Sequence, residues 1–329
     1  MSENDTTSPA GAAEQAAATA GRIRSEIGKA LVGQADVLEQ VLIGLFAAGH
    51  VLIEGVPGLG KTLLVRALAR TFDGRFQRIQ FTPDLMPNDV TGHVMFDMNS
   101  NQFRVRRGPV FTNLLLADEI NRAPAKTQAA LLEVMQEQQV TLEGKGMPVP
   151  LPFMVLATQN PIEQEGTYPL PEAQLDRFLL KILIGYPSEA HERELVRCVT
   201  GGQVGDSLDV SAIETLVKPG AVREIQAVAA GLRVDEKVNE YAVNIARATR
   251  DWPGITLGAG PRGGIALIRC ARSAALLAGR DFVIPDDVKA VALPALRHRI
   301  QLSPELELEG QTPDQVLEGL LERVEAPRT

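Results

Sequence analysis

The segment from residue 55 to residue 62 constrains this chain more than any other. It reads Gly55-Val56-Pro57-Gly58-Leu59-Gly60-Lys61-Thr62. The apolar run Val51-Leu52-Ile53 before it predicts a short buried strand, and residues 63–70 carry apolar side chains at helical spacing. Glycines between a strand and a helix let backbone N–H groups point at an anion, and the helix N-terminus adds partial positive charge. The sequence therefore predicts a phosphate-binding loop and a bound nucleotide.

The side chains of this loop predict further contacts. A lysine in the position of Lys61 reaches the β- and γ-phosphates, and a hydroxyl in the position of Thr62 joins the shell of Mg²⁺. The residues expected to contact the nucleotide are Gly55, Pro57, Gly58, Leu59, Gly60, Lys61, Thr62 and Leu63.

Length and composition suit a two-domain globular protein. The chain has 329 residues, of which 45% are hydrophobic, and its formal net charge is −8. This charge argues against binding to nucleic acid or anionic membranes by bulk electrostatics. The two cysteines and four histidines have no metal-ligand spacing. The sequence has neither an apolar run long enough to span a bilayer nor a secretory signal, so we expect a cytoplasmic protein without membrane insertion.

Apolar segments that alternate with helical patterns predict an α/β fold with a parallel sheet and helices on both faces. The strand candidates are Val51–Ile53, Phe76–Phe81, Leu114–Ala117, Phe153–Ala157 and Leu179–Ile184. Two segments interrupt the alternation and predict inserted β-hairpins, at residues 95–105 and 140–150.

The domain organisation follows from changes of pattern along the chain. Residues 1–20, rich in Ser, Thr, Ala and Glu, are expected to form a disordered tail. After Tyr186-Pro187 the pattern becomes helical, with no convincing strand. We therefore predict an α/β core over residues 21–186 and a small all-helical domain over residues 187–329.

Two acids, Asp118 and Glu119, follow a predicted strand. The strand beside such a loop delivers an Asp to the Mg²⁺ shell at its carboxyl end, so Asp118 is expected to join Thr62 as a metal ligand. Glu119 is the candidate general base for an attacking water. An acidic pair that favours a helix N-terminus is the alternative, but it carries less weight after a complete phosphate-binding loop.

Asn160 ends another buried strand and is expected to lie beside the γ-phosphate, where it would orient the lytic water. A turn-stabilising Asn before Pro161 is the other interpretation, and both can hold.

Two arginines are further candidates. Arg177 could serve a neighbouring subunit's nucleotide as an arginine finger, although an ion pair with Asp176 or Glu172 is the simpler reading. Arg262 follows Pro261 in the first turn of a predicted helix. A cation there opposes the helix dipole, and a bound triphosphate would compensate for this.

Together these motifs resemble the MoxR family of AAA+ ATPases. The resemblance runs from about Ile27 to Arg299 and covers both predicted domains. It is carried by Gly55–Thr62, by Leu116-Ala-Asp-Glu-Ile-Asn-Arg-Ala-Pro124, by Ala157-Thr-Gln-Asn-Pro161 and by Gly166-Thr-Tyr-Pro-Leu-Pro-Glu-Ala-Gln-Leu-Asp-Arg-Phe178.

The resemblance implies a role for each site residue. Lys61 and Thr62 belong to Walker A, Asp118 and Glu119 to Walker B, Asn160 to sensor 1, Arg177 to the arginine finger, Arg262 to sensor 2, and Gly33-Gln34 to the contact with the base. One departure is Gly260, where the family commonly has Ser. A Gly N-cap costs only about a few tenths of a kcal/mol relative to Ser. Whether Arg262 serves its own nucleotide or the neighbour's stays open.

The resemblance also implies a function. It points to a Mg-ATP-hydrolysing, chaperone-like remodeller that forms a homo-oligomeric ring, usually hexameric. Such proteins often work with a partner that carries a von Willebrand factor A domain, and mature or activate a client protein complex. The two hairpins resemble the helix-2 and pre-sensor insertions of this AAA+ branch.

Two other functions share the same core. Residues 103–107, an aromatic with three arginines on the first hairpin, suit a nucleic-acid motor or loader. The acidic net charge and the lack of a basic DNA-reading module make this alternative less favourable. The other is a nucleotide-gated switch without turnover, and Glu119 argues against it because a protein that only binds needs no positioned base.

Overall fold

The computed structural model describes residues 9–56, 58–99, 101–160, 166–200 and 210–327. Its centre is a five-stranded parallel sheet in the order β2-β5-β8-β1-β9. The strands are β1 (Val51–Gly55), β2 (Phe76–Gln80), β5 (Leu114–Asp118), β8 (Met154–Gln159) and β9 (Leu180–Ile184). All five predicted strands and their parallel arrangement are confirmed.

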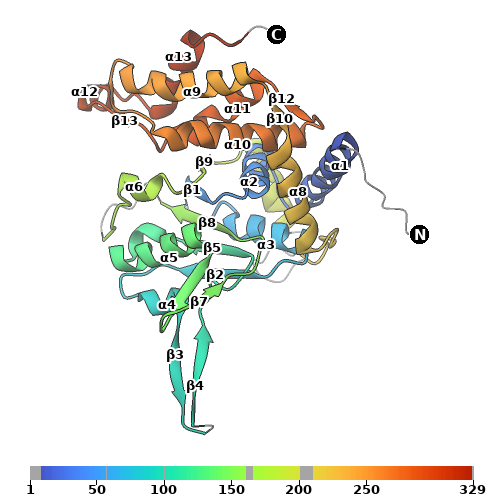
Figure 1. The fold of residues 1–329 in the computed structure, drawn as a ribbon, viewed down its shortest axis with the longest axis vertical. Helices are drawn as coiled ribbons and strands as arrows, with labels where there is room; N and C mark the ends of the chain where they lie inside the picture. The colour runs from blue at the N-terminus through green and yellow to red at the C-terminus, as the bar shows by residue number, and fades with distance from the viewer. Residues whose placement is uncertain (1–8, 57, 100, 161–165, 201–209, 328–329) are drawn as a thin grey trace.

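Helices cover both faces of this sheet (Figure 1). Along β5, Leu114 and Leu116 belong to one hydrophobic cluster, and Leu115 and Ala117 belong to the other. Successive side chains of a strand point to opposite faces, so a continuous apolar run indicates burial on both. The core helices are α1 (Pro9–Gly28), α2 (Ala35–Phe46), α3 (Lys61–Thr71), α4 (Pro87–Thr91), the 3-10 helix η1 (Ile120–Arg122), α5 (Ala125–Glu137) and α6 (Glu172–Leu175).

The expected N-terminal tail is wrong for residues 9–20. These residues form the first part of α1, and Ala13, Ala16, Ala20, Ile23 and Ile27 are buried along it. Their spacing of three and four residues places them on one helix face, and α1 packs on α3, α8 and α10. Alanine favours helices strongly and needs little room, so an Ala-rich composition resembles a solvated tail although the segment belongs to the core.

Two hairpins are inserted in the core, as predicted. The first pairs β3 (Gly92–Asp97) with β4 (Gln102–Arg107), and the second pairs β6 (Gln139–Leu142) with β7 (Lys145–Pro148). Figure 1 shows the first hairpin projecting from the end of the core farthest from the C-terminal helices. Phe96 and Phe103 face each other on it, with ring centroids 5.2 Å apart.

The C-terminal part of the chain is mainly helical. Its helices are α7 (Glu189–Thr200), α8 (Pro219–Gly231), α9 (Glu236–Asp251), α10 (Pro261–Leu277), α11 (Pro285–Leu296), α12 (Pro304–Leu308) and α13 (Pro313–Arg323). The expectation of no strand is corrected by two short pairings, β10 (Arg233–Val234) with β12 (Phe282–Val283) and β11 (Ile255–Leu257) with β13 (Gln301–Leu302). Strands this short carry no alternating pattern, and only tertiary packing brings them together. Within the described ranges, every helix is too short or too polar to cross a membrane.

His50 joins three core elements. Its ring Nδ1 accepts from the Val155 N–H (2.9 Å), so Nε2 carries the proton and donates to the Met135 carbonyl (3.0 Å). Both nitrogens are therefore satisfied only in the neutral ring. Burial lowers the pKa of His50 from 6.5 to about 4.

We expect this histidine to destabilise the fold as the pH falls. In the unfolded chain the pKa of the ring is about 6.5. Between pH 6.5 and pH 4 the unfolded chain therefore binds the proton more readily than the folded chain does. The stabilisation from the neutral His50 ring is present above pH 6.5. By pH 5 its loss lowers the free energy of unfolding by about 2 kcal/mol. Denaturant titrations at pH 7 and pH 5 should show a smaller loss for His50→Gln than for the native chain. Equal losses would contradict the assignment.

Candidate nucleotide-binding site

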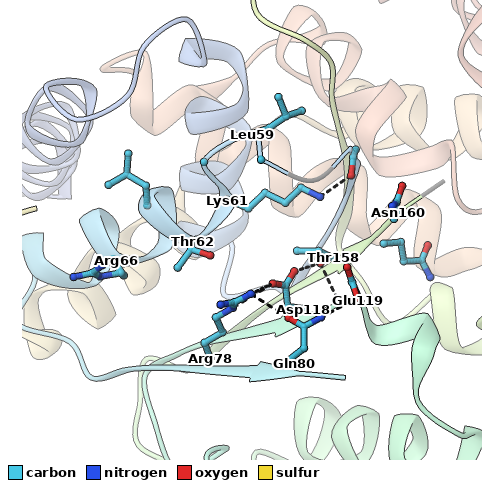
Figure 2. A pocket seen from close by; sticks show the side chains of 15 residues that line it. Leu59, Lys61, Thr62, Arg66, Arg78, Gln80, Asp118, Glu119, Thr158 and Asn160 are labelled. Atoms are coloured by element: carbon cyan, nitrogen blue, oxygen red, sulfur yellow. Dashed lines mark hydrogen bonds and ion pairs between the residues drawn. The ribbon is translucent and has the colours of Figure 1, made fainter. Parts of the chain in front are cut away.

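A cavity of about 420 Å³ opens at the carboxyl end of the sheet. Figure 2 shows the phosphate-binding loop and the start of α3 on one side of it, and the ends of β5 and β8 on the other. The predicted residues that line it are Gly55, Gly58, Leu59, Gly60, Lys61, Thr62, Leu63, Asp118, Glu119 and Asn160. Pro57 lies outside the described residues. The structure thus brings together three motifs that are far apart in the sequence.

The loop needs its glycines. Gly58 and Gly60 have φ of 85° and 72°, a region in which other residues are strained. A Cβ at Gly55 would lie 2.4 Å from the Ile184 carbonyl oxygen. Glycine thus lets the backbone turn tightly from β1 into α3 at Gly58 and Gly60, and lets β1 approach β9 closely at Gly55.

Lys61 lies in the cavity and donates from Nζ to the Gly55 carbonyl at 2.7 Å (Figure 2). Burial lowers its pKa, and the charges of Asp118, Glu119 and Glu54 oppose this effect. A partly buried ammonium at the start of a helix favours a bound anion.

Asp118 is held at the end of β5 by both carboxylate oxygens. Oδ1 accepts from the Thr158 hydroxyl at 2.6 Å, and Oδ2 accepts from Arg78 at 2.6 Å. Thr62 lines the same cavity. Mg²⁺ is commonly held by one or two carboxylates, phosphate oxygens and waters rather than by a protein cage. The Asp118 carboxylate and the Thr62 hydroxyl offer oxygen ligands of this kind at the cavity.

Glu119 has an uncommon backbone conformation. Its φ of 55° is in the left-handed region, which costs about 1–3 kcal/mol for a residue other than glycine. The Glu119 N–H donates to the Thr158 hydroxyl (2.9 Å), and Oε2 accepts from Gln80 (2.8 Å) and pairs with Arg122 (3.1 Å). These contacts hold the carboxylate at the cavity wall, next to the end of β5.

Three residues that orient the two acids were not predicted from the sequence. Arg78 and Gln80 come from β2, where Gln80 pairs in register with Asp118, and Thr158 comes from β8. Their signal was available: each is a polar residue near the carboxyl end of a predicted strand. The strand order, which puts β2 and β8 on either side of β5, is what makes them neighbours.

Asn160 follows the end of β8 and lines the cavity with Glu119, with 9% of its surface exposed. The Gly33-Gln34 pair lies just outside the cavity lining. Gln34 donates from Nε2 to the Leu59 carbonyl at 2.7 Å and so supports the loop from behind. Gly33 has φ of 72° and packs against the ring of His191.

Arg177 and Arg262 line a different cavity of about 390 Å³, which shares no lining residue with the first. Arg177 donates to the Leu132 carbonyl at 2.9 Å. Arg262 pairs with Asp176 at 3.6 Å and is about half exposed. Arg269 and Arg299 complete this arginine-rich cavity. The structure therefore separates Arg262 from the phosphate-binding loop of its own chain.

Comparison with known proteins identifies the fold. The model of the ATPase family associated with various cellular activities matches residues 50–180, and that of the AAA lid domain matches residues 247–320. Chaperone MoxR1 of Mycobacterium tuberculosis is 44% identical, over 97% of this chain and 86% of that protein. This chain belongs to the MoxR family of AAA+ ATPases.

Other members agree with this placement. Protein MoxR of Methylorubrum extorquens is 32% identical over 94% of this chain and 95% of its own length. The uncharacterized protein YeaC of Bacillus subtilis is 46% identical over 93% and 94%. The crystal structure of a candidate ATPase from Cytophaga hutchinsonii superposes with a TM-score of 0.89, at 41% identity over 96% of this chain and 97% of that one. As a MoxR-family AAA+ ATPase, the chain binds and hydrolyses a nucleotide, and its C-terminal helical domain is the AAA+ lid.

Proposed function

We propose that this MoxR-family ATPase is a chaperone-like remodeller that hydrolyses Mg-ATP at sites completed between subunits of a hexameric ring. The observation that carries the proposal is the division of the site residues between two cavities. One holds the phosphate-binding loop and both acids, and the other holds four arginines against a single carboxylate, Asp176. Lys61, Arg66 and Arg78 outnumber the two acids in the first cavity, so it is the phosphates of a bound nucleotide that would attract the arginines of the second. Rotational symmetry would pair the first cavity on each chain with the second on its neighbour.

Each residue then has one task. Lys61 and the loop amides bind the phosphates. Thr62 and Asp118 would hold Mg²⁺, whose positive charge would offset that of the phosphates. Glu119 accepts a proton from the attacking water, and Asn160 orients that water. Arg177 and Arg262 of the adjacent subunit stabilise the charge of the transferred phosphoryl group.

The first hairpin is the proposed contact with a client. Phe103 is 77% exposed and Phe96 is 46% exposed, and exposed apolar side chains that lie together mark protein-interaction surfaces. A relative named as a chaperone supports a protein client, and the resemblance to the family supports a partner with a von Willebrand factor A domain. The arginines of β4 offer less to nucleic acid than the sequence suggested, because Arg104 pairs with Asp97 at 3.1 Å and Arg107 lies over the ring of Phe111.

The dependence of ATPase rate on protein concentration tests the proposal. If sites are completed between subunits, turnover per chain in the presence of Mg²⁺ should rise with concentration and then saturate. A measurable rate that stays flat over the same range would show that each chain hydrolyses alone and would overturn the shared site. Absence of turnover at every concentration would favour the switch without hydrolysis, or point to a required partner.

A further inference from the structure

Arg299 follows α11 in the lid, yet its side chain is inserted into the core. It is only 4% exposed, so its charge is almost fully removed from water. A buried guanidinium is costly unless its N–H groups are paired. Its hydrogen bonds therefore show which part of the core this lid residue contacts.

The guanidinium binds the backbone on both sides of Arg177. It donates to the carbonyl of Phe178 at 2.7 Å, to that of Leu179 at 3.1 Å and to that of Asp176 at 3.3 Å. It also donates to the Ala295 carbonyl of α11. The backbone before and after Arg177 is thus held by one side chain from the lid.

The same guanidinium reaches Arg262 through a carboxylate. Arg299 Nε donates to Asp176 Oδ1 at 2.8 Å, and Asp176 Oδ2 pairs with Arg262 at 3.6 Å. Asp176 is therefore shared between the buried arginine and the exposed one. Both residues proposed to act on the neighbour's nucleotide are linked to a single group in the lid.

We propose that Arg299 is a positioning residue that sets Arg177 and Arg262 for the adjacent subunit's ATP, and so couples the lid of one chain to hydrolysis in the next. The inference rests on the trans role proposed above for Arg177. Arg299 is 8% exposed as a whole residue and lines the arginine-rich cavity, so it acts on the nucleotide through its neighbours. A lysine cannot replace it, because an ammonium has three donors and lacks the planar fork.

The test is Arg299→Lys, which keeps the charge beside Asp176 but loses most of the carbonyl contacts. We expect kcat to fall by at least about tenfold, since small displacements of a catalytic group cost up to about 100-fold. The Kd for ATP should not change, because the variant chain's own nucleotide cavity is untouched. The matched control is Arg297→Lys. The Arg297 side chain is 9% exposed and binds Asp314 and the Lys181 carbonyl, away from Arg177. The kcat of this control should therefore stay near that of the native chain.

Mixing experiments separate positioning from simple folding. Arg299→Lys chains have an intact phosphate-binding loop and both acids, but they present poorly placed arginines to the adjacent subunit. Glu119→Gln chains present well-placed arginines to it. Turnover per Arg299→Lys chain should therefore rise severalfold when the two are mixed. In a parallel experiment, Arg177→Ala chains are mixed with Glu119→Gln chains. If turnover is restored in that mixture but does not rise for Arg299→Lys, the role of Arg299 alone is overturned. Failure of the Arg177→Ala mixture would instead overturn the shared site.

A second variant serves if Arg299→Lys does not fold. Asp176→Asn leaves the carbonyl contacts of Arg299 in place and removes the negative charge that Arg299 and Arg262 share. We expect a smaller fall in kcat, an unchanged Kd and the same rescue by Glu119→Gln. A loss that mixing does not restore would contradict the proposal.

Discussion

Replacing Arg177 with Ala should lower kcat by about 10³-fold or more while leaving the Kd for ATP unchanged, the effect expected of an arginine finger. The reason is positional. Arg177 lines the arginine-rich cavity. That cavity shares no lining residue with the nucleotide cavity of the same chain. Steady-state turnover and equilibrium binding of a nucleotide analogue measure the two quantities separately.

The control for Arg177→Ala is Arg193→Ala, which removes an exposed arginine that pairs across one turn of α7 with Glu189. Such a pair contributes little, so kcat and Kd should both stay at native values. If Arg177→Ala weakened ATP binding as much as Lys61→Ala, the residue would serve its own nucleotide, and the trans assignment would fail.

Glu119→Gln should bind ATP normally and lose turnover by about 10²–10⁴-fold, the range for removal of a general base. An amide keeps the shape of the side chain and can still accept from Gln80, but it cannot take a proton from water. Lys61→Ala is the contrasting variant, because it should remove binding itself. Filter binding and phosphate release, measured on the same samples, distinguish the two defects.

This second result also decides between two functions. A protein that works as a nucleotide-gated switch needs no base, so remodelling by Glu119→Gln chains at the native level would favour the switch. Trapped ATP with loss of activity would exclude it. The strained backbone at Glu119, held by Thr158, agrees with a positioned base, since such strain persists only where surrounding contacts enforce it.

Much of the site could be predicted because its signals are local. A strand, a glycine loop and a helix start are adjacent in the sequence, and so are the acids that end β5. Strand direction then suffices to bring these motifs to one edge, since parallel strands present their carboxyl ends together. The cavity that contains Lys61, Asp118 and Asn160 confirms that convergence.

Contacts between distant elements could not be predicted in this way. The pairing of Arg78 with Asp118 depends on strand order, and the burial of Ala13 and Ala16 depends on the helices that cover α1. From the sequence alone, an exposed polar or small residue cannot be distinguished from a buried one, because burial depends on the neighbouring elements.

The sequence by itself determined the nucleotide-binding core, because the loop, the acids and the apolar strands each specify their local geometry and a parallel sheet brings them together. Only the tertiary structure decided where the arginines lie. Arg177 and Arg262 are placed by the packing of the lid on the core, through Asp176 and the buried Arg299. Such placement arises from residues 123 positions apart in the chain, and no local pattern encodes a contact at that separation.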